Sequence, residues 1–177
     1  MKKIVVIGGG TGTVAVLSGL KQFSDYQLSV IVSMTDDGGS NAVVRDEFGL
    51  LPLSDVRKSI IALAQTDNQL LRELFTYRFS KGDGLSGHTL GNLMMMAAAD
   101  ISGSEEAAIT RLANLFNVKG QVIPVTLEQT QLMAEYASGV QVTGEHLIDE
   151  PATDLGRITR LSLSVPVTAN PAAITAI

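Results

Sequence analysis

The sequence contains no cysteine and no tryptophan among its 177 residues, and only 5% of the residues are aromatic. The absence of cysteine excludes disulfide bonds and thiolate metal sites. No window approaches the ~18 consecutive apolar residues of a membrane-spanning helix, so we expect no membrane span. The first apolar run stops at Gly8 and is too short for the apolar region of a signal peptide. These absences favour a cytoplasmic protein.

Positive charge is also scarce. Lys and Arg number 13 against 18 Asp and Glu, which gives a formal net charge of -5. A chain with this balance has no broad basic face for phosphate backbones, so we expect no nucleic-acid partner. Apolar residues, by contrast, are plentiful at 45%, which is enough to bury a core in a length typical of one domain.

The N-terminal stretch organises the rest of the chain. Ile4–Ile7 is typical of a strand buried on both faces, and four glycines follow within five residues. Apolar residues at helical spacing then predict a helix from Thr13 to Phe23. This order is typical of the first unit of a nucleotide-binding sheet, in which a helix N-terminus holds phosphate. The alternative is a glycine turn that only reverses the chain.

A second strand is predicted from Gln27 to Met34, and a polar glycine loop follows it. Because ligands collect at the carboxyl ends of parallel strands, we expect both glycine loops at the same edge of the sheet. Asp36 lies where a dinucleotide-binding domain places its ribose-binding carboxylate, so a dehydrogenase stays open as an alternative. Thr13 argues against it, because it stands where the third glycine of the dinucleotide fingerprint belongs.

Asp36 and Asp37 are adjacent carboxylates in this second loop. Magnesium is often held by one or two carboxylates together with substrate phosphates, so the pair is a candidate magnesium or substrate-hydroxyl site. An ordinary turn, in which Asp and Gly are common, is the alternative. No other cofactor is indicated by the residues.

The remaining chain alternates helices and strands up to residue 126 and then changes character. Helices are expected over 54–64, 67–78, 89–100 and 104–116, with Ser54 as an N-cap, and a strand over 121–125. Residues 41–53 are expected to form a loop with a short helix. Short alternating segments over 131–136, 141–143 and 158–165 predict a small, partly antiparallel extension. We therefore predict one α/β domain, a Rossmann-like doubly wound and mainly parallel sheet with helices on both faces, comprising a core over 1–126 and an extension over 127–168.

Arginine and histidine supply further candidates for phosphate binding. Arg45, Arg57 and Arg78 could each form a bidentate pair with phosphate, although a surface pair of Arg57 with Asp55 is the simpler reading. His88 lies beside a helix N-terminus, where it could bind an anion or a base edge or serve only as a local hydrogen-bonding residue. Met94, Met95 and Met96 are expected to pack in the core.

Several motifs stand in a fixed order along the chain, and together they resemble one protein family. They are Gly8-Gly9-Gly10-Thr11-Gly12, Thr35-Asp36-Asp37-Gly38-Gly39-Ser40, Asp55-Val56-Arg57, Tyr77-Arg78-Phe79, Leu85-Ser86-Gly87-His88-Thr89-Leu90-Gly91-Asn92-Leu93, Ile123-Pro124 and Gly144-Glu145. The series resembles the gluconeogenesis factor (YvcK-like) proteins, which are related to the 2-phospho-L-lactate transferase (CofD) of deazaflavin coenzyme synthesis. The chain departs from the usual pattern at Asn41-Ala42 and at Ser54 and Lys58.

The resemblance implies a Rossmann-like domain with a nucleotide at the glycine loops. Its YvcK-like branch implies UDP-sugar binding and a role in carbon metabolism, cell-wall synthesis and cell shape, and the motifs favour this branch. The CofD branch implies magnesium and transfer of a phospholactyl-type group from a guanylylated donor to a deazaflavin. The residues to which a binding role is assigned are Gly9, Gly10, Thr11, Gly12, Asp36, Asp37, Ser40, Arg57, His88 and Asn92.

The C-terminal end of the sequence carries an expectation of its own. Asn170-Pro171 predicts the start of a helix, and the sequence stops two turns later at Ile177. Members of the family continue beyond this point, so we expect a truncated chain whose open sheet edge favours self-association or aggregation.

Overall fold

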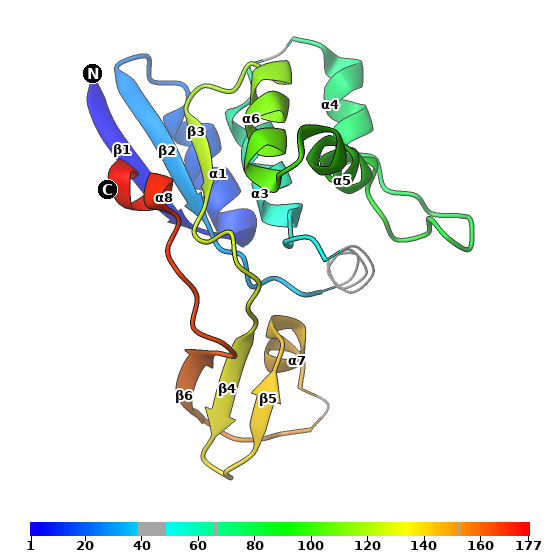
Figure 1. Ribbon diagram of the computed structural model, residues 1–177, viewed down its shortest axis with the longest axis vertical. Helices are drawn as coiled ribbons and strands as arrows, with labels where there is room; N and C mark the ends of the chain where they lie inside the picture. The colour runs from blue at the N-terminus through cyan, green and yellow to red at the C-terminus, as the bar shows by residue number, and fades with distance from the viewer. Residues whose placement is uncertain (39–48, 66, 152) are drawn as a thin grey trace.

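A computed structural model of the chain describes residues 1–38, 49–65, 67–151 and 153–177. Its centre is a parallel sheet of β1 (Lys2–Gly8), β2 (Tyr26–Val32) and β3 (Gln121–Pro124), in the order β1-β2-β3 (Figure 1). The register pairs Gly8 with Val32 and Val32 with Pro124, so all three carboxyl ends meet at one edge. The sequence predicted each of these strands because their apolar runs suit a sheet covered on both faces.

Among the described residues, five helices lie on one side of this sheet, and four of them follow the predicted bounds within two residues. The five are α1 (Gly10–Leu20), α3 (Ser54–Leu63), α4 (Gln69–Thr76), α5 (Leu90–Ser102) and α6 (Glu105–Leu115). The first helix was predicted from Thr13 to Phe23 but begins and ends three residues earlier, because the glycine turn itself forms its first turn. Their buried side chains form the main core with β2, and Phe75 and Phe116 meet at its centre with ring centroids 4.5 Å apart. Met95 is fully buried there, which confirms the core role predicted for this part of the methionine run.

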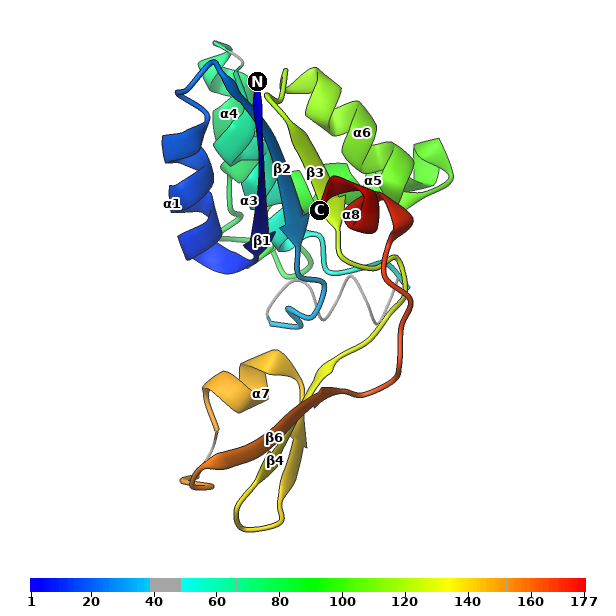
Figure 2. The same cartoon turned by 90° about the vertical axis from the view of Figure 1, so that its left-hand side faces the viewer.

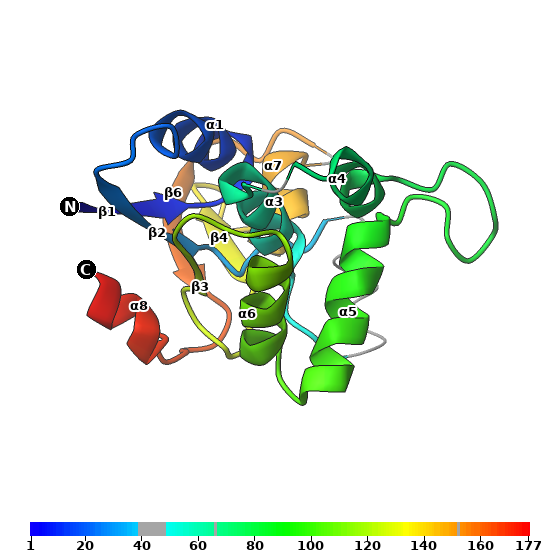
Figure 3. The same ribbon diagram turned by 90° about the horizontal axis from the view of Figure 1, so that it is seen from above.

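Among the described residues, one short helix, α8 (Pro171–Ala176), lies on the opposite face of the sheet (Figure 3). Its Ala173 packs with Ile31 and Ile123 in a second, smaller core. Asn170 caps this helix as predicted, because its Oδ1 accepts a hydrogen bond from the backbone N–H of Ala172 at 2.9 Å. The predicted fold class is confirmed, with helices on both faces of a parallel sheet.

The chain after β3 builds a separate antiparallel sheet, which is the predicted extension. It consists of β4 (Leu132–Tyr136), β5 (Gln141–Thr143) and β6 (Ile158–Leu163) in the order β5-β4-β6, with the short helix α7 (Glu145–Asp149). In Figure 2 this unit lies below the core, and α7 lies on the side of the antiparallel sheet that is nearer the core. The sequence analysis missed α7, because a five-residue helix has no apolar period to detect.

Two further details correct the sequence analysis. Ser54 is the first residue of α3 and does not cap it; the N-cap is Leu53, and the Ser54 hydroxyl accepts a hydrogen bond from Asn92 instead. The short helix was expected somewhere within residues 41–53, and residues 41–48 of that range lie outside the described residues. Among the helices that the structure describes, none has both the length and the apolar content to cross a membrane.

Candidate functional site

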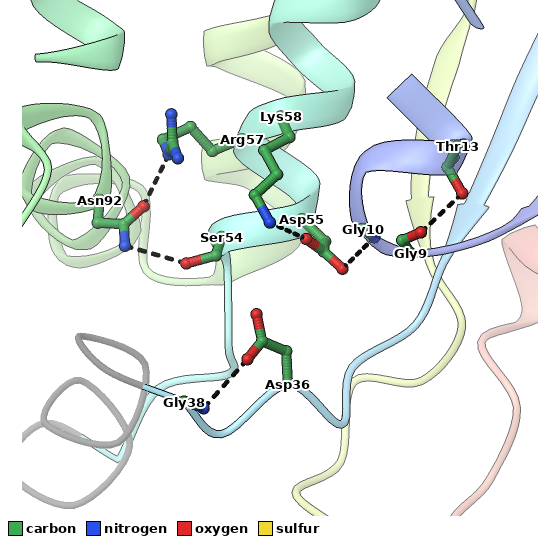
Figure 4. Close-up of polar contacts among 10 residues, drawn as sticks. All are labelled: Gly9, Gly10, Thr13, Asp36, Gly38, Ser54, Asp55, Arg57, Lys58 and Asn92. Carbon is green, nitrogen blue, oxygen red and sulfur yellow. Dashed lines mark hydrogen bonds and ion pairs between the residues drawn. The ribbon is translucent and has the colours of Figure 1, made fainter. Parts of the chain in front are cut away.

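The N-termini of α1, α3 and α5 converge at the edge of the sheet where β1 and β2 end (Figure 4). Direct contacts connect them, since the Gly10 amide of α1 donates to Asp55 of α3 and Asn92 of α5 donates to Ser54 of α3. Each helix N-terminus presents unpaired N–H groups and a positive dipole end. The arrangement brings three helix N-termini together at one place, at the edge where the sequence predicted both glycine loops.

The glycines of the first loop differ in whether the structure requires glycine at their positions. A Cβ atom at Gly9 would lie 2.6 Å from Asp55 Oδ2, so packing of the protein itself excludes a side chain there. Gly10 has φ of 67°, which favours glycine, while the space above its Cα is open. Gly12 has neither constraint, because its φ is not left-handed and no atom lies within 4 Å of a Cβ built on it. No contact with another described residue requires glycine at position 12.

Asp55 occupies part of the site that the sequence analysis assigned to phosphate. Its Oδ2 accepts from the Gly10 amide at 2.6 Å, and its Oδ1 forms an ion pair with Lys58 at 2.7 Å. The alternative prediction, a surface pair between Asp55 and Arg57, is therefore wrong. A phosphate at this helix would have to use the amides of Thr11 and Gly12, which are both exposed residues. The ion pair with Lys58 offsets the negative charge of Asp55 beside that phosphate.

Arg57 and Asn92, both predicted binding residues, are hydrogen-bonded to one another. Arg57 Nε donates to Asn92 Oδ1 at 2.9 Å, and its Nη1 donates to the carbonyl of Phe75 at 3.4 Å. Arg57 is buried, and in the described chain no carboxylate lies within ion-pair distance of it. Burial lowers the pKa of its guanidinium, and the nearby charge of Arg78 lowers it further. Asp55 lies near enough for its charge to offset part of this shift but forms no ion pair with Arg57. A buried cation without an ion pair favours an anionic ligand, although the contacts also brace α3 against α4 and α5.

The two adjacent aspartates face different neighbours. Asp36 is half-buried, accepts a hydrogen bond from the Gly38 amide at 3.1 Å, and points toward Ser54 and Asp55 in Figure 4. Asp37 is only 4% exposed and accepts hydrogen bonds from the backbone of His146 and the side chain of Gln131. Burial alone would raise the pKa of the Asp37 carboxyl, but the bonds from His146 and Gln131 outweigh burial and hold it below its usual value.

A second contact between the loop and the extension is made by Thr35, whose hydroxyl donates to Glu145 Oε2 at 2.8 Å. Burial raises the pKa of the Glu145 carboxyl, and the charges of Asp36, Asp149 and Asp55 raise it further. Three or more metal-ligating side chains do not gather at any one point of the described residues. A magnesium site at Asp36 and Asp37 stays a prediction, and a ligand phosphate would have to supply the remaining oxygens.

The other predicted residues are placed as follows. His88 precedes the N-cap of α5, and its Nδ1 is buried without a hydrogen-bond partner among the described residues. Arg78 lies in the segment between α4 and α5 and donates a hydrogen bond to the carbonyl of Gly87. Ser40 and Arg45 lie outside the described residues. The sequence analysis gave no role to His146 or Gln131, because no local pattern indicates that either residue reaches the loop after β2.

Comparison with known proteins identifies the family of this chain. The family model described as 2-phospho-L-lactate transferase CofD matches residues 4–177. The chain belongs to the CofD family. It is similar to a Nostoc sp. protein, at 46% identity over 99% of this chain and 38% of the other. The protein named gluconeogenesis factor in Bacillus subtilis is 38% identical over 88% of this chain and 49% of that protein.

The CofD-family fold is also seen in a solved structure. A crystal structure of a Bacillus halodurans protein superposes on this chain with a TM-score of 0.92 and 36% identity, and covers 99% of this chain. The match covers 56% of the Bacillus halodurans chain. The chain thus spans about half the length of the relatives it matches, or less. The activities of those longer proteins are therefore only proposals for this chain.

Proposed function

We propose that this chain binds a nucleotide sugar, with a UDP-sugar as the first choice, and that it serves a regulatory role in carbon metabolism. Support for carbon metabolism comes from its similarity to gluconeogenesis factors. Support for the nucleotide comes from the position of its glycine loop at the carboxyl ends of two parallel strands, where ligands of such sheets bind. Roles in cell-wall synthesis and cell shape are proposed from the family resemblance alone.

The observation that carries the proposal is the open first turn of α1. Among the described residues nothing requires position 12 to lack a side chain, and no described atom outside the helix lies within 4 Å of a Cβ built there. Closely approaching ligand phosphates would explain this, because they bind helix N-terminal amides best when no side chain intervenes. The diphosphate would then lie on the amides of Thr11 and Gly12, with Asp36 as an acceptor for a ribose or sugar hydroxyl.

The matched pair Gly12→Val and Gly19→Val tests this function. Gly12 lies in the first turn of α1 and Gly19 in its last turn, and at neither would a new Cβ lie within 4 Å of a described atom outside the helix. The two variants therefore add the same side chain to the same helix, and only Gly12→Val adds it beside the proposed site. We expect UDP-glucose or UDP-N-acetylglucosamine to raise the Tm of the wild type and of Gly19→Val, by binding the folded state. Gly12→Val should lose that rise while it keeps its ligand-free Tm.

Failure of every UDP-sugar to raise the Tm of the wild type would contradict the proposal, as would equal binding by Gly12→Val. NAD belongs in the same panel, because a rise with NAD alone would favour the dehydrogenase alternative. GDP with Mg²⁺ belongs there for the second candidate function.

That second candidate is a CofD-like, magnesium-dependent transfer of a phospholactyl-type group from a guanylylated donor to a deazaflavin. The observation that favours it is that the carboxylates of Asp36, Glu145 and Asp149 line one cavity, where their negative charges repel one another. A hard cation at Asp36 would offset this repulsion. A Tm rise with GDP that requires Mg²⁺ and is lost in Asp36→Asn would favour the transferase over the regulatory protein.

A further inference from the structure

Among the described residues, the short loop that follows β2 makes several side-chain contacts with the extension. The side chain of Asp37 reaches from that loop to Gln131, at the start of the extension, and to His146, on α7. Thr35 reaches Glu145 from the same loop. Near the two connecting segments, by contrast, a cavity of about 160 Å³ remains between Met34 of the core and Leu163 of β6. Apolar packing at this junction is therefore incomplete, and polar contacts carry much of the attachment.

We propose that Asp37 is a positioning residue that docks the extension onto the loop after β2, and that Asp36 is left to face the ligand. The docking does not depend on the identity of the ligand. The role of Asp36 rests on the function proposed above. The family resemblance assigned one binding role to both carboxylates, and the structure separates them.

The surroundings of Asp37 are built for a carboxylate that stays in place. Its Oδ1 lies 3.1 Å from the backbone nitrogen and 2.9 Å from Nδ1 of His146, and its Oδ2 lies 3.0 Å from Gln131 Nε2. A Cβ at Gly144 would lie 2.6 Å from Asp37 Oδ2, so a glycine is required where β5 meets α7. A buried carboxylate with several donors from one unit fixes that unit, because losing them would leave a charge unsatisfied.

Asp36 has a different relation to the extension. Its hydrogen bond to the Gly38 amide stays within its own loop, so it makes no such anchor. It also lines a cavity of about 330 Å³ with Glu145, Leu147 and Asp149 of α7. Docking by Asp37 thus decides how close α7 stands to Asp36, and a ligand that contacts Asp36 would sense whether the extension is docked.

Hydrogen exchange of the ligand-free chain tests the docking directly. We expect Asp37→Asn to speed exchange of amides in β4 and α7 by about tenfold to hundredfold, since hydrogen bonds to charged groups are lost there. Exchange in β1 and β2 should not change. Asp36→Asn is the matched control, because it makes the same chemical change one residue earlier, and the extension should stay protected in it.

A second variant guards against a chain that fails to fold. The His146 side chain is 52% exposed, so His146→Ala removes one bond to Asp37 without opening the core. It should speed exchange in α7 in the same direction as Asp37→Asn but less. Combining the two substitutions should give less than the product of their separate effects, because both remove the same contact.

Three results would overturn the proposal: unchanged exchange of α7 in Asp37→Asn, equally faster exchange in β1 and β2, or undocking by Asp36→Asn. The coupling to ligand has its own readout. UDP-glucose should slow exchange of α7 in the wild type and not in Asp37→Asn. If UDP-glucose binds no variant, the proposed function fails, while the ligand-free comparison still decides the role of Asp37.

Discussion

The parallel core and the antiparallel extension are stabilised in different ways. In the core, α1, α3 and α6 pack on one face of the sheet and α4 and α5 pack on these helices, so that side chains such as Phe75 and Phe116 are completely inaccessible. In the extension, Ala134 is fully buried and Tyr136 nearly so, while Leu161 remains 55% exposed and Leu163 41% exposed. The extension therefore leaves a larger share of its apolar side chains open to solvent than the core does. The contrast indicates that the core is stabilised by packing and that the extension is positioned by polar contacts with the core.

The largest expected effect tests this contrast by removing one apolar side chain from each region. Phe75→Ala deletes a fully buried ring and should cost about 3–5 kcal/mol of folding free energy, because a cavity remains. Leu161→Ala removes a half-exposed side chain and should change it by less than about 0.5 kcal/mol. Urea denaturation of both variants measures the difference. A cost for Leu161→Ala as large as that for Phe75→Ala would show that the extension has a tightly packed core after all.

An intermediate effect is expected from Asn92→Asp, which sharpens the assignment of Arg57. The new carboxylate would pair with the buried guanidinium of Arg57 and would lie favourably at the N-terminus of α5, so the Tm should stay within a few degrees of the wild type. Asn92→Ala, the control, leaves Arg57 Nε without its acceptor and should cost about 1–3 kcal/mol. If Arg57 binds the anionic part of a nucleotide, Asn92→Asp should weaken that binding by about tenfold or more. Unchanged affinity by calorimetry would leave Arg57 with a bracing role only.

The smallest effect concerns pH and Glu145. The pKa of Glu145 is higher in the folded chain than in the unfolded chain, so its protonated form adds to the free energy of unfolding. This contribution is complete below the unfolded pKa, ~4.3, and is lost as the pH rises through the folded pKa. Glu145→Gln keeps an acceptor for Thr35 and cannot ionise. We therefore expect the variant to match the wild type near pH 4 and to be slightly more stable near pH 7.5. Thermal melts across this pH range measure the difference in Tm. A wild-type Tm that rises relative to that of the variant as the pH increases would contradict the prediction.

Much of the core could be predicted from local sequence. The run Ile4–Ile7, the N-caps Thr89, Ser104 and Asn170 and the breaks between helices each act within a few residues. Such signals do not depend on what the segment later packs against. The convergence of the glycine loop and Asp36 at one edge also followed, because parallel strands place their carboxyl ends together.

The division of roles between Asp36 and Asp37 could not be predicted in the same way. Two adjacent carboxylates in a glycine loop look equivalent in the sequence, and the partners that distinguish them are His146, which is 109 residues further along the chain, and Gln131, which is 94 residues further along. The same holds for Asp55, which reaches the Gly10 amide across 45 residues. The sequence by itself determined which segments form strands and helices, because hydrophobic period, caps and glycine act locally. Only the tertiary structure decided which carboxylate is buried and which is left open, because burial and hydrogen-bond partners depend on segments that meet only after folding.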